Sequence, residues 1–328
     1  MKKYSRSLIS KLSIGCSVLA IAVYLFLGRT QTAPVSQPID ETPYDHYQIV
    51  LLDENDMFVP LTVRVKKGNT TETWNQLLEL MKTTQQATSL FRGFLDSDLA
   101  LHEAKQSQDT LNLDFNSAFL NYEKQHELKI LEAMVFMAHQ FGATKVNLLV
   151  DHFQLQYMPM KNTVVSQPLT RKIGINNFMN EADHIQRSSP ITIFYEKKIQ
   201  GQRFLVPQTK RVNHSKITME LLLEELLDRV FVSSLLEQPL HSKDVSFAKP
   251  PLIEKDRLTL YFEESILEEE RTINDLYLQL LLLSIKANSS IQKVKIMVGE
   301  DTVGLGGMNE EFIDVNSILY NYLSTAPN

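Results

Sequence analysis

The hydrophobic and polar positions of this chain follow two periods, which predict short strands and amphipathic helices. In the segment 109–115 apolar residues alternate with polar ones, as in a strand with one buried face. In the segment 71–81 the apolar residues Trp74, Leu77 and Met81 recur at helical spacing. A strand that alternates in this way belongs to a sheet covered on one side only, so the helices are expected to pack on one face of the sheet.

The predicted elements come in one order, which the chain passes through twice. The order is strand, strand, helix, strand, strand, helix, strand, and it is typical of a small mixed sheet in the α+β class. The first copy is predicted to hold strands at 47–52, 57–65, 99–104, 109–115 and 145–150, and helices over 71–81 and 127–141. The second copy is predicted to hold a hairpin over 191–212, a helix from 218, a strand at 256–262, a helix over 273–287 and a strand at 293–298.

The two copies share sequence as well as order. The string MFVPLTVRV (57–65) returns as FLVPQTKRV (204–212), 147 residues later. The same spacing aligns DTLNLDF with DRLTLYF, and a spacing of 148 aligns KVNLLV (145–150) with KVKIMV (293–298). A match that persists over nearly a hundred residues at so long a period indicates two tandem domains, not a solenoid of short repeats.

Three details of the repeats carry structural expectations. Pro60 and Pro207 cannot donate a backbone hydrogen bond, so their strands either lie at a sheet edge or are broken there. The helix predicted over 273–287 is apolar on more than one face, so it is either sandwiched or in contact with a partner. Packing between the two repeats is the favoured alternative. Thr71 and Thr218 begin the first helix of each copy and are expected to cap it.

Before the repeats lies an apolar segment that predicts a membrane anchor. Residues 12–28 carry no charge and follow four basic residues, so the basic flank is expected in the cytoplasm and the rest of the chain outside it. A cleaved signal peptide has the same charge order, but no small-residue cleavage site follows the run, which favours an uncleaved anchor. The single cysteine, Cys16, lies inside this run and rules out a disulfide framework. Ser13 stands where a lipoprotein signal has Leu, which disfavours lipidation.

Composition divides the chain into five parts. Residues 30–42 are rich in Thr, Gln, Ser and Pro, which predicts an extended linker. The predicted parts are the basic flank and anchor at 1–29, a linker at 30–46, a first domain at 47–180, a linker at 181–189 and a second domain at 190–328. After residue 29 there are 28 basic and 39 acidic residues, a formal net charge of −11. Such an acidic unit is a poor partner for nucleic acid or anionic lipid head groups.

The order of elements and several strings resemble GerMN domains, the modules of GerM-type sporulation and spore germination proteins. The resemblance rests on the VPLTVRV and VPQTKRV strings, on LNLDFNSAF (111–119), on FGATKVNLLVD (141–151) and on SQPLTRKIGIN (166–176) at the end of the first copy. The second copy matches less well, since Tyr261 stands in the place of Asp114. The specificity of the match comes from order and spacing, because none of these strings is catalytic.

This resemblance implies a fold and a role. The fold is two tandem copies of a small mixed-sheet module with helices on one face, similar to the ring-building modules of secretion systems and of the channel between forespore and mother cell, after an N-terminal transmembrane helix. The role is assembly or localisation of an envelope complex in sporulation or germination, without catalysis and without a cofactor. Related modules also look to be attached to envelope sensor systems in bacteria that form no spores, so the family name does not prove that this organism forms spores.

The histidines of the chain do not form a recognisable catalytic or metal-binding motif. His126 and His139 lie thirteen residues apart on one predicted helix, without the HExxH spacing of a zinc site. Two adjacent pairs would point their side chains apart in a strand and are expected to be exposed polar residues: His102 with Glu103, and Asp151 with His152.

The acidic and glycine-rich stretches are expected to be loops. Paired carboxylates could serve a wall glycosidase or bind calcium, but the DxDxDG order is missing, and such a run more often lies in a solvated loop and helix start. The glycine cluster at 304–307 lacks a phosphate-binding pattern and is predicted to be a turn. No catalytic, cofactor-binding or metal-binding residue is therefore predicted. The acidic run discussed above consists of Glu263, Glu264, Glu268, Glu269 and Glu270.

Three functional classes remain open. The favoured one is a non-catalytic scaffold, tethered as a single-pass membrane protein with its C-terminal domains outside the cytoplasm. Such a scaffold contacts other exported or membrane proteins, or copies of itself, through exposed sheet faces or edges. The second class is a ligand-binding accessory subunit of an envelope sensor system, and the least favoured is a cell-wall hydrolase. No nucleic-acid partner is expected.

Overall fold

The computed structural model describes seven stretches of the chain: 43–83, 90–178, 188–227, 234–242, 245–268, 272–303 and 311–322. Residues Tyr44–Asn328 form one compact unit, separate from Met1–Pro43. The predicted anchor, with Cys16, lies outside the described residues, as do most of both predicted linkers and the glycine cluster at 304–307. None of the helices in the described stretches is long and apolar enough to cross a membrane.

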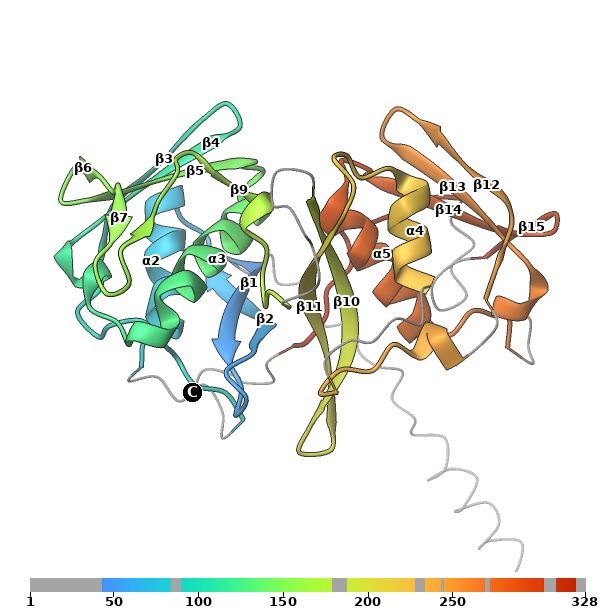
Figure 1. The fold of residues 1–328 in the computed structure, drawn as a ribbon, viewed down its shortest axis with the longest axis horizontal. Helices are drawn as coiled ribbons and strands as arrows, with labels where there is room; N and C mark the ends of the chain where they lie inside the picture. The colour runs from blue at the N-terminus through green and yellow to red at the C-terminus, as the bar shows by residue number, and fades with distance from the viewer. Residues whose placement is uncertain are drawn as a thin grey trace, which may run out of the picture. The chain divides into compact units, whose positions relative to one another are not determined.

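Both repeats contain the predicted order of elements (Figure 1). The first repeat has β1 (Tyr44–Leu52), β2 (Phe58–Lys66), α2 (Thr70–Leu80), β3 (Leu101–Ser107), β4 (Thr110–Phe115), α3 (Glu127–Ala138) and β5 (Lys145–Val150). The second repeat has β10 (Ser189–Ile199), β11 (Gln202–Val212), α4 (Met219–Leu227), β12 (Phe247–Glu254), β13 (Arg257–Phe262), α5 (Asp275–Asn288) and β14 (Lys293–Val298).

Shorter elements surround this common core. After β5 come the short strands β6 (Phe153–Gln154), β7 (Tyr157–Met158), β8 (Thr163–Val164) and β9 (Leu169–Thr170), and after β14 come β15 (Asp301–Val303) and β16 (Ile313–Asp314). Single-turn helices are Ser117–Leu120, Lys124–His126, His139–Phe141, Arg171–Ile173, Pro239–Ser242 and Glu264–Ile266.

The main sheets are mixed, as predicted, but each repeat divides its strands between a main sheet and a separate hairpin, and β7–β8 forms a further two-stranded sheet in the first repeat. Five strands form the main sheet, in the order β3-β4-β5-β6 with β9 also on β5, and in the order β12-β13-β14-β15 with β16 also on β14. The central pairs β4–β5 and β13–β14 are parallel, because a helix connects their strands. The opening hairpins β1–β2 and β10–β11 each form a separate two-stranded sheet.

In each repeat the helices lie between the main sheet and the hairpin and cover one face of the sheet (Figure 1). Leu111, Leu113 and Phe115 of β4 point into this layer and are fully buried. On the other face of the same sheet, the Asn147 side chain donates a hydrogen bond to Asn112 Oδ1 at 2.9 Å. The alternation in the sequence therefore predicted the covered and the open face of the sheet.

Helix α5 is buried on several sides, but mainly inside its own repeat. Its closest neighbours are β10 and α4, so the second apolar face is covered by the hairpin of the same repeat. The expectation that this helix packs between the repeats is wrong for most of its length. The first repeat contacts its C-terminal end, where Arg171 Nη1 donates to the carbonyls of Lys286 and Ala287 at 2.9 and 2.7 Å. A cation in this position satisfies carbonyls that the helix itself leaves free.

The first helix of each repeat, α2 and α4, is capped at its N-terminus by a different kind of residue. Asn69, not Thr71, is the N-cap of α2, and it forms a capping box with Glu72. Thr71 instead bonds to β3, where its Oγ1 accepts from the Ala104 amide at 2.9 Å. Thr218 does cap α4, since its Oγ1 accepts from Leu221 N at 3.2 Å. The two aligned threonines therefore serve different contacts.

Amide side chains bind the strands at positions that have no neighbouring strand. In each case the side-chain oxygen accepts from the N–H of one strand residue and the side-chain NH₂ donates to the carbonyl of the same residue, as a neighbouring strand would. These contacts close edges that would otherwise be open to pairing with another chain. The pairs are Asn75 with Leu101, Gln76 with Lys66, Gln140 with Gln48, Gln167 with Leu148, Asn176 with Phe58, Asn288 with Thr192 and Asn321 with Leu205.

Two neighbouring residues of α2 test the value of these contacts. Asn75→Ala is expected to lower the free energy of unfolding by about 1–3 kcal/mol, because it leaves the partly buried N–H and carbonyl of Leu101 without a partner. Gln76→Ala removes the same kind of contact at an exposed site, where water replaces it, and should cost less than about 0.5 kcal/mol. Urea denaturation of both variants measures the difference; equal losses would contradict the role given to the amide contacts.

Candidate functional site

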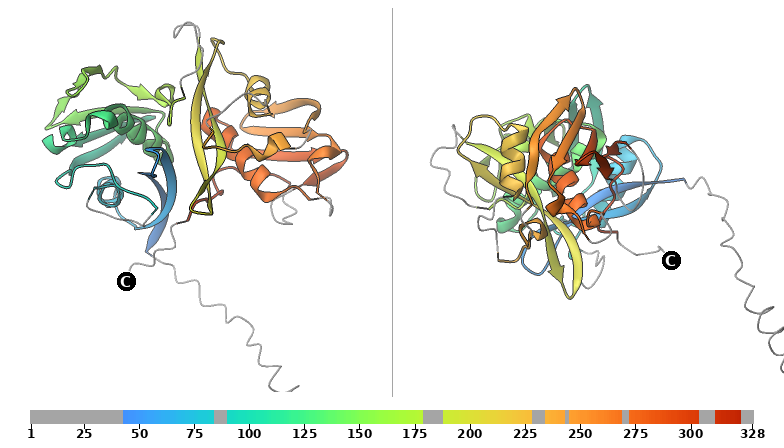
Figure 2. Two further views of the ribbon diagram at one scale, coloured as in Figure 1. Left: turned by 60° about the horizontal axis from the view of Figure 1, so that its bottom comes forward. Right: turned by 90° about the vertical axis from the view of Figure 1, so that its right-hand side faces the viewer.

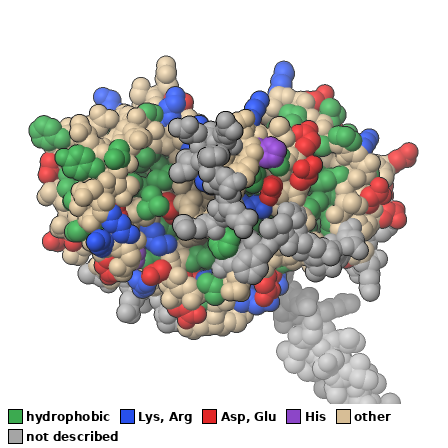
Figure 3. Space-filling view, viewed as in Figure 1, with side chains coloured by type: hydrophobic (Ala, Val, Ile, Leu, Met, Phe, Trp, Pro, Cys, Tyr) green, Lys and Arg blue, Asp and Glu red, His purple; other side chains and the backbone are tan. Residues whose placement is uncertain are grey.

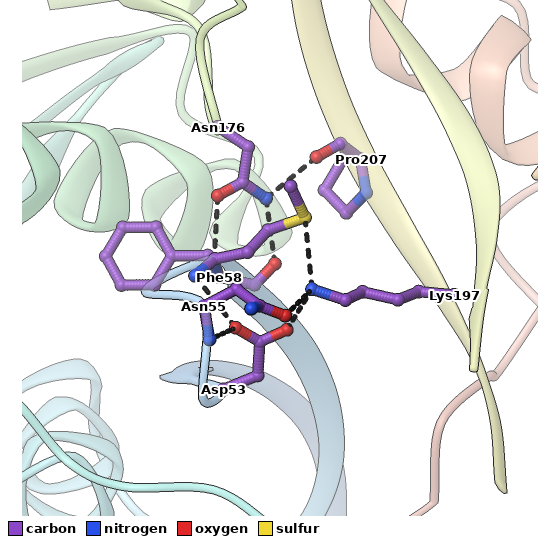
Figure 4. Close-up of polar contacts among 7 residues, drawn as sticks. Asp53, Asn55, Phe58, Asn176, Lys197 and Pro207 are labelled. Atoms are coloured by element: carbon purple, nitrogen blue, oxygen red, sulfur yellow. Dashed lines mark hydrogen bonds and ion pairs between the residues drawn. The ribbon is translucent and has the colours of Figure 1, made fainter. Parts of the chain in front are cut away.

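Two asparagines, one at the end of each repeat, join the repeats to each other. The Asn176 side chain accepts from Phe58 N at 2.8 Å and donates to Phe58 O at 2.8 Å, both in its own repeat. Its NH₂ group also donates to the carbonyl of Pro207 in the second repeat, at 2.9 Å (Figure 4). One side chain therefore holds strand β2 of the first repeat and strand β11 of the second.

Asn321 makes the same three contacts from the other repeat. It accepts from Leu205 N at 2.8 Å, donates to Leu205 O at 2.7 Å, and donates to the Pro60 carbonyl of the first repeat at 2.8 Å. Both asparagines adopt the left-handed backbone conformation, with φ of 49° and 52°, which asparagine tolerates better than most residues. The contact is therefore repeated with the roles of the two repeats exchanged, as in a two-fold symmetric interface.

Two buried threonines, Thr62 and Thr209, add to these contacts between the repeats. We call the set formed by Asn176, Asn321, Thr62 and Thr209 the joint. Thr209 of the second repeat donates its N–H to Ile175 O, and its Oγ1 accepts from Ile175 N, both at 2.9 Å. Thr62 of the first repeat donates its N–H to Asn321 O at 2.9 Å and its hydroxyl to Tyr320 O at 2.6 Å. The closing segment of each repeat thus bonds to the hairpin of the other. The residues shared by the two strings VPLTVRV and VPQTKRV include those that build the joint.

The prolines of those strings lie at the joint and do not break their strands. Pro60 pairs with Val50, and Pro207 with Phe194, within unbroken ladders. Of the two alternatives drawn from the sequence, the edge position is the one observed. The carbonyl of each proline receives an asparagine NH₂ from the other repeat. A residue with an N–H at either place would bring a donor into a buried edge between the repeats.

A buried ion pair also links the repeats. Lys197 of β10 donates to Asp53 in the β1–β2 turn, and both side chains are almost completely buried (Figure 4). The other Asp53 oxygen accepts from the amides of Asn55 and Met57 at 2.8 and 3.0 Å, so the turn itself holds the carboxylate in place. The sequence indicated a turn at Asp53 but gave no sign of its partner, which lies 144 residues away.

A second buried carboxylate, Glu132 of α3, contacts the segment that carries Asn176. Its two oxygens accept from the Asn176 amide at 3.1 Å and from the Asn177 side chain at 2.7 Å. Burial raises the pKa of Glu132 to about 7, against the opposing effects of the Asn177 hydrogen bond and the Lys129 charge. The segment that carries Asn176 therefore rests on a group that titrates near neutral pH.

A separate feature of the first repeat is an exposed apolar surface on the strands β6, β7 and β8. We call it the β6–β8 surface; its large side chains are Phe153, Tyr157, Met160 and Val164, with exposures of 78%, 60%, 44% and 73%. Hydrophobic side chains gather over this part of the first repeat, at the left of Figure 3. Large apolar side chains grouped at a surface are typical of protein interaction sites.

A buried carboxylate holds this surface in place. Glu127, at the start of α3, accepts hydrogen bonds from Lys161 N at 2.8 Å, from Thr163 N at 3.2 Å and from the Thr163 hydroxyl at 2.6 Å, and one from Tyr122. Burial alone would raise the pKa of Glu127, but these hydrogen bonds outweigh it and lower the pKa. The β6–β8 surface is therefore a fixed shape, which reduces the entropy that a partner must overcome on binding. The described part of the second repeat carries Asn274 at the aligned position.

The structure brings together two histidine–aspartate pairs whose members are distant in sequence: His152 with Asp114, 38 residues apart, and His102 with Asp151, 49 residues apart. Strands β4 and β5 are parallel, so Asp114 near the end of β4 reaches the turn that follows β5 and bonds to His152. His102 Nε2 lies 3.4 Å from Asp151 Oδ1, and the two histidine rings are 5.3 Å apart. The sequence predicted exposed polar residues here, and the side chains of His102, Asp151 and His152 are 39%, 54% and 77% exposed. In the described stretches no group of three or more His, Cys, Asp and Glu residues could hold a metal ion.

The remaining candidates are dispersed. His126 and His139 are the N-cap and C-cap of α3, at opposite ends of the helix. Glu263, Glu264 and Glu268 are exposed, while Glu269 and Glu270 lie outside the described residues. The three described glutamates of the run are therefore surface residues, and Glu268 Oε1 accepts a hydrogen bond from the Asn274 side chain at 3.0 Å.

These features define a class: a protein of two tandem α+β modules that are joined by their own hairpins and closing segments. No family model matches the chain. It is 28% identical over 262 residues to the spore germination protein GerM of Bacillus subtilis, a match that covers 76% of this chain and 70% of GerM. The solved tandem GerMN domains of the sporulation protein GerM from Bacillus subtilis match with a TM-score of 0.69 and 24% identity, over 80% of this chain and 97% of that structure. The resemblance seen in the sequence is confirmed: the chain is similar in sequence to GerM, and its fold is that of two tandem GerMN domains.

The asparagine joint can be tested by an isosteric change. Asn176→Asp keeps the shape but removes both N–H donors to Phe58 O and Pro207 O and buries a charge beside them, so the free energy of unfolding should fall by about 3 kcal/mol or more. Asn321→Asp should have a similar effect, because its contacts are the same. Asn121→Asp, outside the joint, is the control. Urea denaturation measures all three, and a loss confined to one of the two joint asparagines would contradict the shared role.

The pH dependence of stability tests Glu132. Its raised pKa means that the folded protein binds more protons than the unfolded chain between about pH 4.5 and 7, so this group's contribution is fully present below about pH 4.5 and is lost as the pH rises through 7. The wild type should therefore lose up to about 3 kcal/mol relative to Glu132→Gln between pH 5 and pH 8. Thermal unfolding at both values measures this difference. Parallel curves for the two proteins would show that Glu132 does not titrate in this range.

Proposed function

We propose that this chain is a membrane-tethered, extracytoplasmic scaffold that assists the assembly or localisation of an envelope complex in sporulation or germination. The relationship to GerM supports a role linked to sporulation or germination. The observation that carries the scaffold role is the β6–β8 surface, a group of exposed apolar side chains on a fixed frame. The partner is a second exported or membrane protein that covers these side chains.

The joint supports this proposal because it makes the two repeats one body. Asn176, Asn321 and the Asp53–Lys197 pair connect the repeats through buried or partly buried contacts, which resist separation more than surface ion pairs do. A rigid two-module body can hold a partner in a defined orientation. No described residue group favours catalysis, and the exposed glutamates of the acidic run give no support to the hydrolase hypothesis.

The location is inferred from the charge pattern of the first residues. The apolar run at 12–28 with its basic flank supports a single membrane anchor, with both repeats outside the cytoplasm. Residues 30–42 form the linker in this proposal. The tether keeps the repeats close to membrane proteins, which raises the effective concentration of such partners.

The test is in vivo crosslinking of a tagged, full-length copy, followed by mass spectrometry. The wild type should crosslink to exported or membrane proteins. The double variant Phe153→Ser, Tyr157→Ser should give a crosslinking yield about tenfold lower, because aromatic anchors dominate the binding energy at interfaces. Both side chains are exposed, so the variant should fold normally.

The matched control lies on the second repeat. Leu252 and Ile253 of β12 are also exposed apolar residues, at 46% and 47%, and the double variant Leu252→Ser, Ile253→Ser should keep its crosslinks. Recovery of the wild type without any partner would contradict the scaffold role. Equal losses in the two double variants would show that the β6–β8 surface is not the contact site.

A further inference from the structure

The end of the β1–β2 hairpin, where the chain enters the compact unit, carries a cationic and aromatic face. Tyr44 pairs with Lys66 and His46 pairs with Arg64 across the two strands, so all four side chains lie on one face of the hairpin. The Arg64 guanidinium lies 5.1 Å from the centre of the Tyr44 ring. A fifth side chain, Tyr322, meets His46 edge-on, with 6.1 Å between the rings.

We call these five residues the entry face. Tyr44 and Tyr322 are 40% and 56% exposed, and Arg64 and Lys66 are exposed as well. None of the five is acidic. The nearest carboxylate in sequence, Asp45, points to the opposite face of the strand, where it lies 3.7 Å from Lys67. The entry face is therefore locally cationic within a unit whose formal net charge is negative.

The sequence before the hairpin brings this face close to the membrane. The apolar run ends at residue 28, and Tyr44 is the first residue of β1, so 15 residues lie between them. A flexible chain of that length has a root-mean-square span of about 20 Å. The start of β1, the deep-blue end of the chain, lies at the periphery of the unit in both views of Figure 2. With the tether of the proposed function, the entry face lies on the strand that follows the tether directly in the chain.

We propose that the entry face rests on an anionic lipid surface, with Arg64 and Lys66 at the phosphates and Tyr44 and Tyr322 at the level of the head groups. Tyrosines are enriched at membrane interfaces, and basic side chains near the surface are attracted to anionic lipids. The negative charge of the rest of the unit opposes general adsorption, but salt screens it beyond about 8 Å. The expectation that the unit avoids anionic lipids therefore holds for its net charge and not for this face. The inference rests on the membrane tether of the proposed function.

The test measures the reactivity of single lysines in the full-length protein. The protein is reconstituted in vesicles of phosphatidylcholine, with or without phosphatidylglycerol, and labelled with an amine reagent before mass spectrometry. Labelling of Lys66 should fall about fivefold when phosphatidylglycerol is present. Lys249, an exposed lysine 3.7 Å from the Tyr261 ring in the second repeat, is the internal control and should label equally in both.

A charge reversal separates lipid contact from other causes of protection. Arg64→Glu should restore the labelling of Lys66 on anionic vesicles, whereas Arg257→Glu, which alters a cation beside Phe312 in the second repeat, should not. Equal labelling of Lys66 in both lipid mixtures would overturn the inference. So would equal protection in detergent, because it would point to a contact between proteins.

The two proposals fail in distinguishable ways. Protein that does not float with vesicles of either composition lacks the tether, and both the membrane location in the proposed function and the entry-face inference are then wrong. Protein that floats but keeps Lys66 reactive on anionic vesicles retains the tether and the proposed scaffold role, and only the lipid contact is lost.

Discussion

The structure depends on two asparagine side chains that each bond to both repeats. Asn176 and Asn321 each satisfy the N–H and carbonyl of a strand in their own repeat, and each donates one further hydrogen bond to a proline carbonyl in the other. Asn176 is buried and Asn321 is half-buried, so breaking the joint would leave several polar groups without partners, at a cost of about 1–3 kcal/mol each. That penalty explains why the two modules behave as one unit and not as beads on a linker.

The joint also limits how copies of this chain can assemble. An interface in which each partner plays both roles is complete once two modules have met, so it cannot extend to a third. The joint is filled by the two repeats of a single chain. Amide side chains such as Asn75 and Asn288 occupy several of the remaining strand edges. The joint and these edges are therefore not open to pairing with another chain, whereas the β6–β8 surface exposes four large apolar side chains to solvent.

The fold could be predicted from the sequence wherever one short-range pattern decides the structure. The alternation in 109–115 and the helical spacing after Thr71 predicted a strand and a helix that the structure contains, because burying an apolar face requires that period. Strand β12 was not predicted, because its residues are mostly exposed and show no such alternation. The match of VPLTVRV to VPQTKRV revealed the duplication. Capping was less predictable: Asn69 and Thr71 are both suitable caps, and the position of Ala104 on β3 decides which of them caps α2.

By itself the sequence determined the two modules, their α+β class and the absence of a recognised catalytic motif, since these follow from local periodicity and residue type. Only the tertiary structure decided how the modules meet, because each contact of the joint links residues far apart in the chain: Asn176 with Pro207, Asp53 with Lys197. The two candidate surfaces, the β6–β8 surface and the entry face, were likewise decided by the tertiary structure. Phe153 and Tyr44 are ordinary apolar residues in the sequence, and it is the frame held by Glu127, or the end of a hairpin, that leaves them exposed to solvent.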